Sequence, residues 1–166
     1  KRKLHHTNII CEWGRYIAAP AQINIYKVID TKKIQSKKAA ADKWYVIDGS
    51  FMNDLCDTWA IKQNWAIVPV NSSTDRHLAE VWLAGSTCDS DDVYNGTKGS
   101  ISLPDYEMDE GKPMYVAVLD TGAYEDALVM HHCLLSSPLK IMVENGHVVV
   151  ARKRESPEEV GKAFGW

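Results

Sequence analysis

The sequence lacks long apolar runs and has no strong excess of either charge. A membrane-spanning helix needs about 18 or more consecutive apolar residues, and no run reaches that length. The 166 residues carry 19 Lys and Arg against 22 Asp and Glu, which gives a formal net charge of −3. Nucleic-acid binding would require a basic patch or stripe. We therefore predict neither a membrane partner nor a nucleic-acid partner.

The sequence also lacks closely spaced cysteines. The four cysteines are Cys11, Cys56, Cys88 and Cys133. Without a Cys-x-x-Cys pair, they predict neither a structural zinc site nor a disulfide framework. Free thiols persist in a reducing compartment, so the cytoplasm is the expected location. The adjacent histidines at 5–6 and 131–132 are interpreted as packing or surface residues, and we predict no metal site.

What is present is an alternation of apolar and polar residues, which predicts a mainly β domain. The predicted strands are residues 22–34, 43–47, 65–70, 80–84 and 114–119, with a hairpin over 140–151. This hairpin turns at Asn145-Gly146, a pair that accepts the positive φ angles of a tight turn. Many short strands and few helices favour a barrel or a sandwich.

Two helices are expected beside the strands. Ser156 as N-cap, Pro157 at the first helical position and Glu159 as the partner in a capping box predict a terminal helix. It should end at about residue 164. A second helix is expected within residues 122–135.

Two segments have the side chains of an anion site. Residues 12–16 read Glu-Trp-Gly-Arg-Tyr, in which the glycine allows close backbone approach and the arginine can grip a phosphate. The glutamate can pair with a protonated ring nitrogen. The turn over residues 120–124 would offer backbone N–H groups and the Tyr124 hydroxyl to an anion. Taken singly, residues 12–16 are more typical of a surface turn, and residues 120–124 are more typical of an ordinary helix start.

Two further segments would suit a cation. Residues 85–92 read Gly-Ser-Thr-Cys-Asp-Ser-Asp-Asp, and their acids disfavour a thiolate. Cys88 is therefore better suited to giving a proton than to nucleophilic attack, and Asp89 can meet a cationic substrate group. Residues 48–54, followed by Asp57 and Trp59, combine acids with an aromatic side chain. An acidic turn and a hydrated loop are the alternatives.

In this order and spacing, the four segments resemble the fold-type III decarboxylases that depend on pyridoxal phosphate. That family, which acts on ornithine, diaminopimelate or arginine, carries Glu-Pro-Gly-Arg, an Asp-Gly turn, Cys-Asp-Ser or Cys-Glu-Ser, and Gly-Ala-Tyr. The resemblance extends from Glu12 to the final helix. Two departures stand out. Trp13 replaces the usual proline, and Glu125 follows Tyr124 where many relatives have glycine.

The resemblance implies a mainly β fold, the C-terminal β-barrel domain of an alanine-racemase-like decarboxylase with a terminal helix. Residues 1–16 would be a remnant of the end of a (β/α)8 barrel domain, with residues 9–15 as its last strand. Residues 17–166 would be the C-terminal β-domain. The Schiff-base lysine would then lie upstream, outside this chain. The expected partners are the protein's own N-terminal barrel domain and a second copy, in a homodimer with shared active sites.

The resemblance also implies roles for the residues that would hold pyridoxal 5'-phosphate. Glu12 would pair with the pyridine nitrogen and keep it protonated, so that the ring can act as an electron sink. Gly14 and Arg15 would contact the phosphate, and Tyr124 would add a further contact.

Three other residues would serve the substrate. Cys88 would reach across the dimer interface and help to protonate the carbon that loses CO2. Asp89, also given to the partner's site, would bind the distal cation of a small amino-acid substrate, and Asp57 is a further candidate for that cation.

The substrate expected first is arginine, in polyamine biosynthesis. Residues 57–63 resemble an Asp-Ala-Trp-x-x-x-Gln stretch of biosynthetic arginine decarboxylases, as do residues 87–91. Ornithine or lysine comes next, and diaminopimelate after those. Residues 152–155 are more similar to the diaminopimelate decarboxylases than to the arginine decarboxylases. The rival classes are a non-catalytic β-domain that mediates dimerisation, a small-molecule-binding barrel and a racemase. A racemase would use a tyrosine in place of Cys88-Asp89.

Overall fold

Strand β1 (Asn24–Lys33) is the longest strand and runs through the middle of the main sheet. The computed structural model describes residues 8–71, 77–108 and 111–166. The strand order is β3-β7-β1-β2-β4-β5, and β6 pairs with the first half of β4. The other strands of this sheet are β2 (Lys43–Ile47), β3 (Ile67–Pro69), β4 (Leu78–Ala84), β5 (Val93–Tyr94), β6 (Ile101–Pro104) and β7 (Tyr115–Val118).

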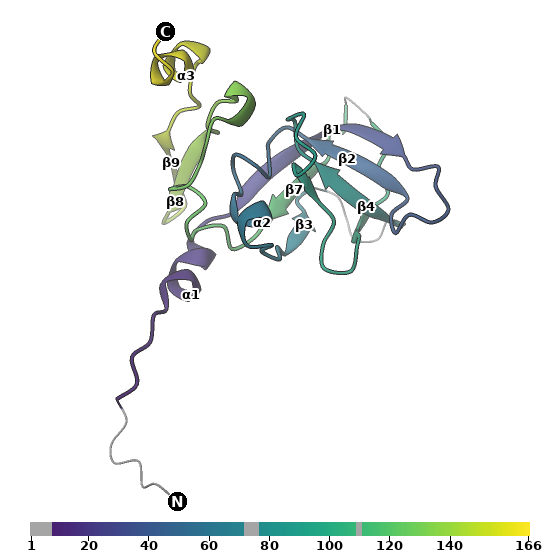
Figure 1. Ribbon diagram of the computed structural model, residues 1–166, viewed down its shortest axis with the longest axis horizontal. Helices are drawn as coiled ribbons and strands as arrows, with labels where there is room; N and C mark the ends of the chain where they lie inside the picture. The colour runs from purple at the N-terminus through teal and green to yellow at the C-terminus, as the bar shows by residue number, and fades with distance from the viewer. Residues whose placement is uncertain (1–7, 72–76, 109–110) are drawn as a thin grey trace, which may run out of the picture.

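The main sheet curls until it is nearly closed (Figure 1). Strands β3 and β6 lie near opposite ends of the pairing order and nevertheless contact each other. The prediction of a mainly β, barrel-like domain with a terminal helix is confirmed. Strands β5 and β6 were not predicted, because two and four residues are too few for an alternating pattern to show.

The core lies inside this curled sheet. Along β2 the side chains of Tyr45 and Ile47 are fully buried, whereas the alternate residue Trp44 is only partly buried, as the two-residue period of a strand requires. Phe51, from the loop after β2, is also fully buried, and its ring stacks on Tyr94 with 5.7 Å between ring centroids. The loop that follows β2 is therefore fastened to the core.

A two-stranded hairpin and the terminal helix lie beside the main sheet (Figure 1). The hairpin consists of β8 (Lys140–Glu144) and β9 (His147–Arg152), and its turn has positive φ at Asn145 and Gly146 as predicted. Helix α3 (Pro157–Ala163) begins after the Ser156–Glu159 capping box, which has both of its hydrogen bonds. The predictions of the hairpin and of the last helix are confirmed.

The prediction of a helix within residues 122–135 is wrong. Residues 123–128 form bends and turns, residues 129–131 have no regular structure, and only a short 3₁₀ helix, η2 (His132–Leu134), follows. Tyr124, Cys133 and Leu134 have positive φ angles, which no right-handed helix accepts. Asp126 instead pairs with Lys140 of β8 at 2.7 Å, so a tertiary contact replaces the helix. The expected helix start that would bind an anion therefore does not exist.

The strand expected over residues 9–15 is also absent. Residues 8–13 are in no strand, and helix α1 (Gly14–Ala18) begins within the expected range, followed by η1 (Ala19–Ala21). An isolated strand leaves its N–H and C=O groups unpaired, and no described segment pairs with residues 8–13. The other helix, α2 (Asp57–Ala60), had no predicted counterpart.

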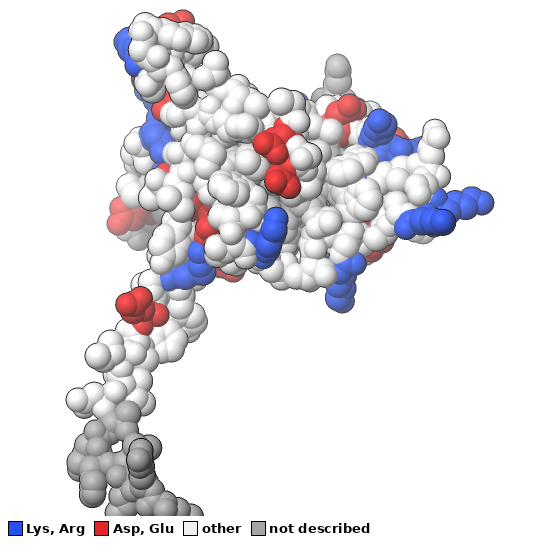
Figure 2. Space-filling view, in the orientation of Figure 1, with Lys and Arg blue, Asp and Glu red and all other residues white. Residues whose placement is uncertain are grey.

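Charged side chains of both signs are scattered over the face of the molecule that Figure 2 shows. Within the described ranges, no helix combines the length and apolar character needed to cross a membrane. Apolar side chains are exposed on both strands of the hairpin: Val143 and Val148 are 66% and 65% exposed. The hairpin therefore presents uncovered apolar surface.

Candidate active site

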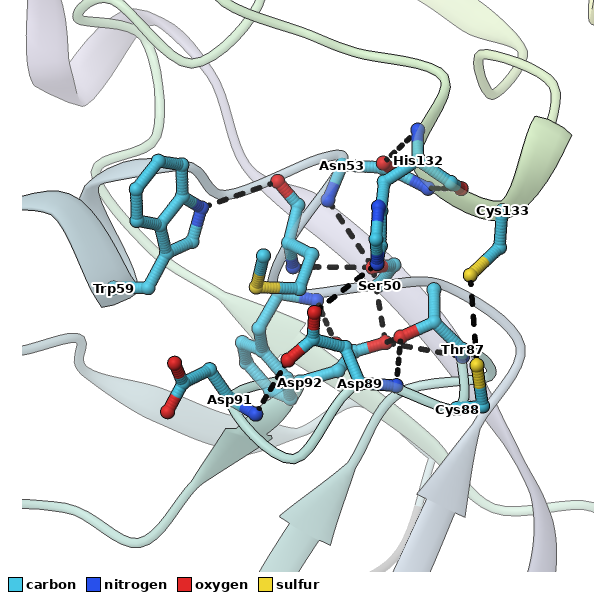
Figure 3. A network of polar contacts seen from close by, with 12 residues as sticks. Ser50, Asn53, Trp59, Thr87, Cys88, Asp89, Asp91, Asp92, His132 and Cys133 are labelled. Atoms are coloured by element: carbon cyan, nitrogen blue, oxygen red, sulfur yellow. Dashed lines mark hydrogen bonds and ion pairs between the residues drawn. The ribbon is translucent and has the colours of Figure 1, made fainter.

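A buried carboxylate, that of Asp92, fastens two loops together at one end of the sheet (Figure 3). It accepts hydrogen bonds from Ser50 Oγ at 3.0 Å and from the Phe51 N–H at 2.7 Å. It also accepts from the N–H and Oγ1 of Thr87, at 3.1 and 2.6 Å. A Cβ at Gly85 would lie 2.1 Å from this carboxylate, so only glycine leaves room for it there.

The two loops meet because the strands that precede them are neighbours. Strand β2 leads into residues 48–56 and β4 into residues 85–92, and the two strands pair in parallel. The carboxyl ends of parallel neighbours lie at the same edge of a sheet. Two loops that are far apart in the sequence are thereby placed side by side.

A third loop is held against the first by the buried side chain of Asn53. Its Nδ2 donates to the carbonyl of His132 at 2.9 Å, and its Oδ1 accepts the His132 N–H at 2.8 Å. The imidazole of His132 reaches the second loop, with Nε2 3.1 Å from Asp89 Oδ2. The other oxygen of Asp89 accepts the Asp91 N–H at 2.9 Å. Three loops therefore converge on Asp89 (Figure 3).

Two thiols lie at the same convergence. The sulfur atoms of Cys88 and Cys133 are 3.8 Å apart, and both residues are exposed. The loop locked by Asp92 presents Cys88 and Asp89 together, in the order that the sequence pattern singled out. No local pattern marks His132 or Cys133 as a site residue, because their contacts are made across the fold. From the sequence, we interpret His132 as a packing or surface residue and Cys133 as a free thiol.

Arg15 and Tyr124 form a second group of residues that the sequence singled out. The guanidinium carbon of Arg15 lies 4.9 Å from the centre of the Tyr124 ring, a cation–π contact. Arg15 also pairs with Asp57 at the start of α2. A Cβ built on Gly14 would lie 3.5 Å from Tyr124 Oη, so this hydroxyl lies close to the backbone of α1.

Glu125 is a fully buried acid next to this second group. Its Oε2 accepts the Asp57 N–H at 3.3 Å, and its Oε1 has no hydrogen-bond partner within the described part of the chain. Burial raises the pKa of Glu125 to about 7, the neighbouring Asp57 carboxylate adds to the rise, and Arg15 opposes it. Near neutral pH this carboxyl is therefore close to half protonated.

The other predicted site residues lie apart from one another. Glu12 is exposed in the segment before α1, and it makes no hydrogen bond or ion pair with a described residue. Asp57 is 5% exposed and faces Arg15. In the portion of the chain that the structure describes, no hydrogen bond or ion pair joins Asp57 to Asp89. The structure thus brings Gly14, Arg15 and Tyr124 together and leaves Glu12 outside that group.

Residues 15–122 match the family model described as the pyridoxal-dependent decarboxylase C-terminal sheet domain. The chain belongs to this family. It is 32% identical over 100 residues to the arginine decarboxylase of Glycine max, covering 60% of this chain and 14% of that protein. It is 31% identical over 149 residues to the diaminopimelate decarboxylase of Aquifex aeolicus, covering 89% of this chain and 32% of that protein.

A solved structure shows the same fold. The biosynthetic arginine decarboxylase from Campylobacter jejuni matches with a TM-score of 0.76 and 16% sequence identity, over 92% of this chain and 40% of that chain. The chain spans a third or less of the two curated relatives, at 14% and 32% of their lengths. Both arginine and diaminopimelate decarboxylases are therefore among the relatives.

The group around Arg15 fits the phosphate of the family's cofactor. Arg15 Nη1 is buried and has no hydrogen-bond partner among the described residues, so it keeps an N–H group for an anion. Tyr124 supplies a hydroxyl beside the backbone of Gly14. An arginine with a free N–H, a hydroxyl and a glycine backbone is a donor set that suits a phosphate.

The buried Glu125 should make stability fall as the pH rises. Its folded-state pKa of about 7 lies above the ordinary value of 4.5, so the folded state binds more protons than the unfolded state between these pH values. Stability is therefore lost over this window, by roughly 3–4 kcal/mol at about 1.4 kcal/mol per pKa unit. We expect Glu125→Gln to match wild type near pH 4.5 and to have the higher Tm at pH 8.

The measurement is the thermal midpoint of the full-length protein at several pH values. The exposed Glu144→Gln provides a matched control, and it should follow wild type throughout. Parallel curves for wild type and Glu125→Gln would contradict the prediction.

Proposed function

We propose that this chain is the C-terminal β-domain of a pyridoxal-phosphate-dependent decarboxylase that acts on a basic amino acid, arginine first. The observation that carries the proposal is the exposed thiol of Cys88 beside the partly exposed carboxylate of Asp89, on a loop that the buried Asp92 locks in place. A thiol that can give a proton beside a carboxylate that can hold a cation suits decarboxylation of such a substrate. Membership of the family supports the same reaction.

The cofactor would be held at the group around Arg15. Gly14, Arg15 and Tyr124 would contact the phosphate, and Asp57 would hold the guanidinium in place through its ion pair. Glu12 would pair with the pyridine nitrogen. Pyridoxal phosphate, when bound, supplies an electron sink for the bond that breaks as CO2 leaves. The lysine that binds it covalently would lie upstream of residue 1, in a barrel domain of which residues 1–16 would be the last part.

Asp89 would bind the distal cation of the substrate. Its carboxylate is partly exposed and is held by His132 and by the Asp91 N–H, so its charge faces the same convergence as the Cys88 thiol. Arginine is placed first because residues 57–63 and 87–91 resemble arginine decarboxylases, which are also among the relatives. The activity would then serve polyamine biosynthesis in the cytoplasm. Ornithine, lysine and diaminopimelate are the alternatives, the last because diaminopimelate decarboxylases are also relatives.

The full-length protein would be a homodimer whose active sites are shared. Cys88 and Asp89 would serve the partner's cofactor, while α1 and the hairpin would pack on the protein's own barrel domain. Exposed apolar side chains support this packing, since Tyr16 and Ile17 of α1 are 78% and 73% exposed. The same exposed surface favours a second candidate function, a non-catalytic β-domain that mediates dimerisation.

Substitutions of Cys88 and of Asp89 should affect different kinetic constants. Cys88→Ala should lower kcat by about 10²–10⁴-fold with the cofactor still bound, because one positioned acid contributes that much. Asp89→Ala should raise KM and lower kcat/KM by about 10–100-fold, because it removes a hydrogen bond to a charged group. The measurement is CO2 release by the full-length protein from arginine, ornithine, lysine and diaminopimelate.

Two controls accompany these assays. Cys11→Ala removes an exposed thiol elsewhere, and Ser90→Ala changes the exposed neighbour of Asp89. Both should retain wild-type kinetics. A wild-type protein that decarboxylates none of the four amino acids would leave dimerisation as the function of this domain.

Shared active sites predict complementation between two inactive variants. Full-length Cys88→Ala would be mixed with a full-length variant that lacks the cofactor-binding lysine of the barrel domain. Each heterodimer would then contain one site in which both groups are intact, so part of the activity should return. Heterodimer formation would be measured separately with differently tagged chains. Heterodimers that form and stay inactive would show that Cys88 does not serve the partner's site.

A further inference from the structure

The backbone of His132 is fixed by hydrogen bonds to a buried side chain. Its backbone N–H and C=O are both bonded to the side chain of Asn53, which is 3% exposed. Asn53 belongs to the loop that Asp92 fastens through Ser50 and Phe51. The place from which the imidazole extends is therefore set by buried hydrogen bonds.

From that place the imidazole reaches Asp89. Nε2 lies 3.1 Å from Oδ2, and the Asp91 N–H occupies Oδ1 at 2.9 Å. Two donors on two oxygens limit rotation of the carboxylate, because any turn of the side chain would lengthen both hydrogen bonds. A neutral imidazole that donates its Nε2–H achieves this and leaves the negative charge of Asp89 in place.

We propose that His132 is a positioning residue that determines specificity for substrates with a distal cation. His132 acts through Asp89, so this proposal rests on the proposed function. The imidazole orients the carboxylate for the guanidinium or ammonium group of the substrate, whereas the reacting carbon is served by Cys88. Loss of the imidazole affects the binding of the substrate more than the chemical step.

The test compares His132→Leu and His132→Gln in the full-length protein. His132→Leu removes the donor, and KM for arginine should rise by about 10-fold or more with kcat within about twofold of wild type. The Kd for arginine measured by calorimetry should rise in parallel. His132→Gln keeps an N–H group near the position of Nε2 and should restore most of the affinity. A rescue of this kind is not expected of a residue that only fills space.

A double-mutant cycle with Asp89→Ala separates positioning from a general structural role. In the Asp89→Ala background, His132→Leu should have no further effect on KM, because the carboxylate that it orients is gone. Unchanged KM in His132→Leu, additive effects in the cycle, or no rescue by His132→Gln would overturn the inference while the enzyme remains active. A wild-type protein without decarboxylase activity would instead overturn the proposed function on which the inference rests.

The thiols of Cys88 and Cys133 lie next to each other on the surface. Cys88 and Cys133 are 45 positions apart, both are exposed, and their sulfur atoms are 3.8 Å apart. A disulfide brings sulfur atoms to about 2.05 Å, so a modest movement of two surface loops would join them. Cys133 follows His132, whose backbone Asn53 holds, and so this thiol is kept beside Cys88.

We infer that Cys88 and Cys133 form a reversible disulfide with each other, and that the oxidant is a low-molecular-weight disulfide such as oxidised glutathione. The thiolate of one cysteine attacks the S–S bond of oxidised glutathione, forms a mixed disulfide and releases one glutathione thiol. The thiolate of the other cysteine then attacks the mixed disulfide, forms the Cys88–Cys133 bond and releases the second glutathione thiol. The two cysteines lose two protons and two electrons and gain one S–S bond, while the S–S bond of the oxidant is reduced to two thiols. Oxidation removes the proton of Cys88 and should switch off the proposed reaction.

The test treats the full-length protein with oxidised glutathione and maps its peptides by mass spectrometry. A cross-linked peptide pair that contains Cys88 and Cys133 should form, two thiols should be lost, and dithiothreitol should reverse both changes. Cys133→Ser should form no such pair and keep its activity in the oxidant, whereas Cys11→Ser should behave as wild type. Glutathione adducts without the cross-link, or an unmodified pair of thiols, would overturn the inference whether or not the protein is a decarboxylase.

Discussion

The hydrogen bonds to the buried Asp92 carboxylate are the interaction on which the candidate site depends. A buried charge must be met by donors, and here four of them, from Ser50, Phe51 and Thr87, converge on it. Hydrogen bonds to a charged group contribute about 1.5–3 kcal/mol each, which is more than neutral ones do. Without this carboxylate, the donors of both loops would be left buried and unpaired.

From this anchor, one segment links both groups of site residues. Phe51 is buried against Tyr94, and Asn53 of the same loop clamps the backbone of His132, which reaches Asp89. The segment then continues into α2, where Asp57 pairs with Arg15. The loop after β2 therefore supports the Cys88–Asp89 side and the Arg15–Tyr124 side at once, although no described hydrogen bond or ion pair joins the two sides directly.

The charges around Arg15 are nearly balanced before any anion arrives. Asp57 opposes the guanidinium charge, and the buried Glu125 beside them keeps a proton up to about neutral pH because burial raises its pKa to about 7. A glycine at this position would bring no such carboxyl. The affinity of this group for an anion is therefore tied to the protonation of a side chain that departs from the pattern of the resembling family.

Local patterns of residues were enough to predict part of the fold and part of the candidate site. Alternation predicted β1, β2 and β7, Asn145-Gly146 predicted the hairpin, and Ser156 with Glu159 predicted the last helix, because the residues that decide each element are near neighbours. Short motifs likewise singled out Cys88, Asp89, Arg15 and Tyr124. The turn at Tyr124, the contact of His132 with Asp89 and the contact of Cys133 with Cys88 became known only from the folded chain. These arrangements depend on the parallel pairing of β2 with β4 and on hydrogen bonds between distant loops, and no local pattern encodes such contacts.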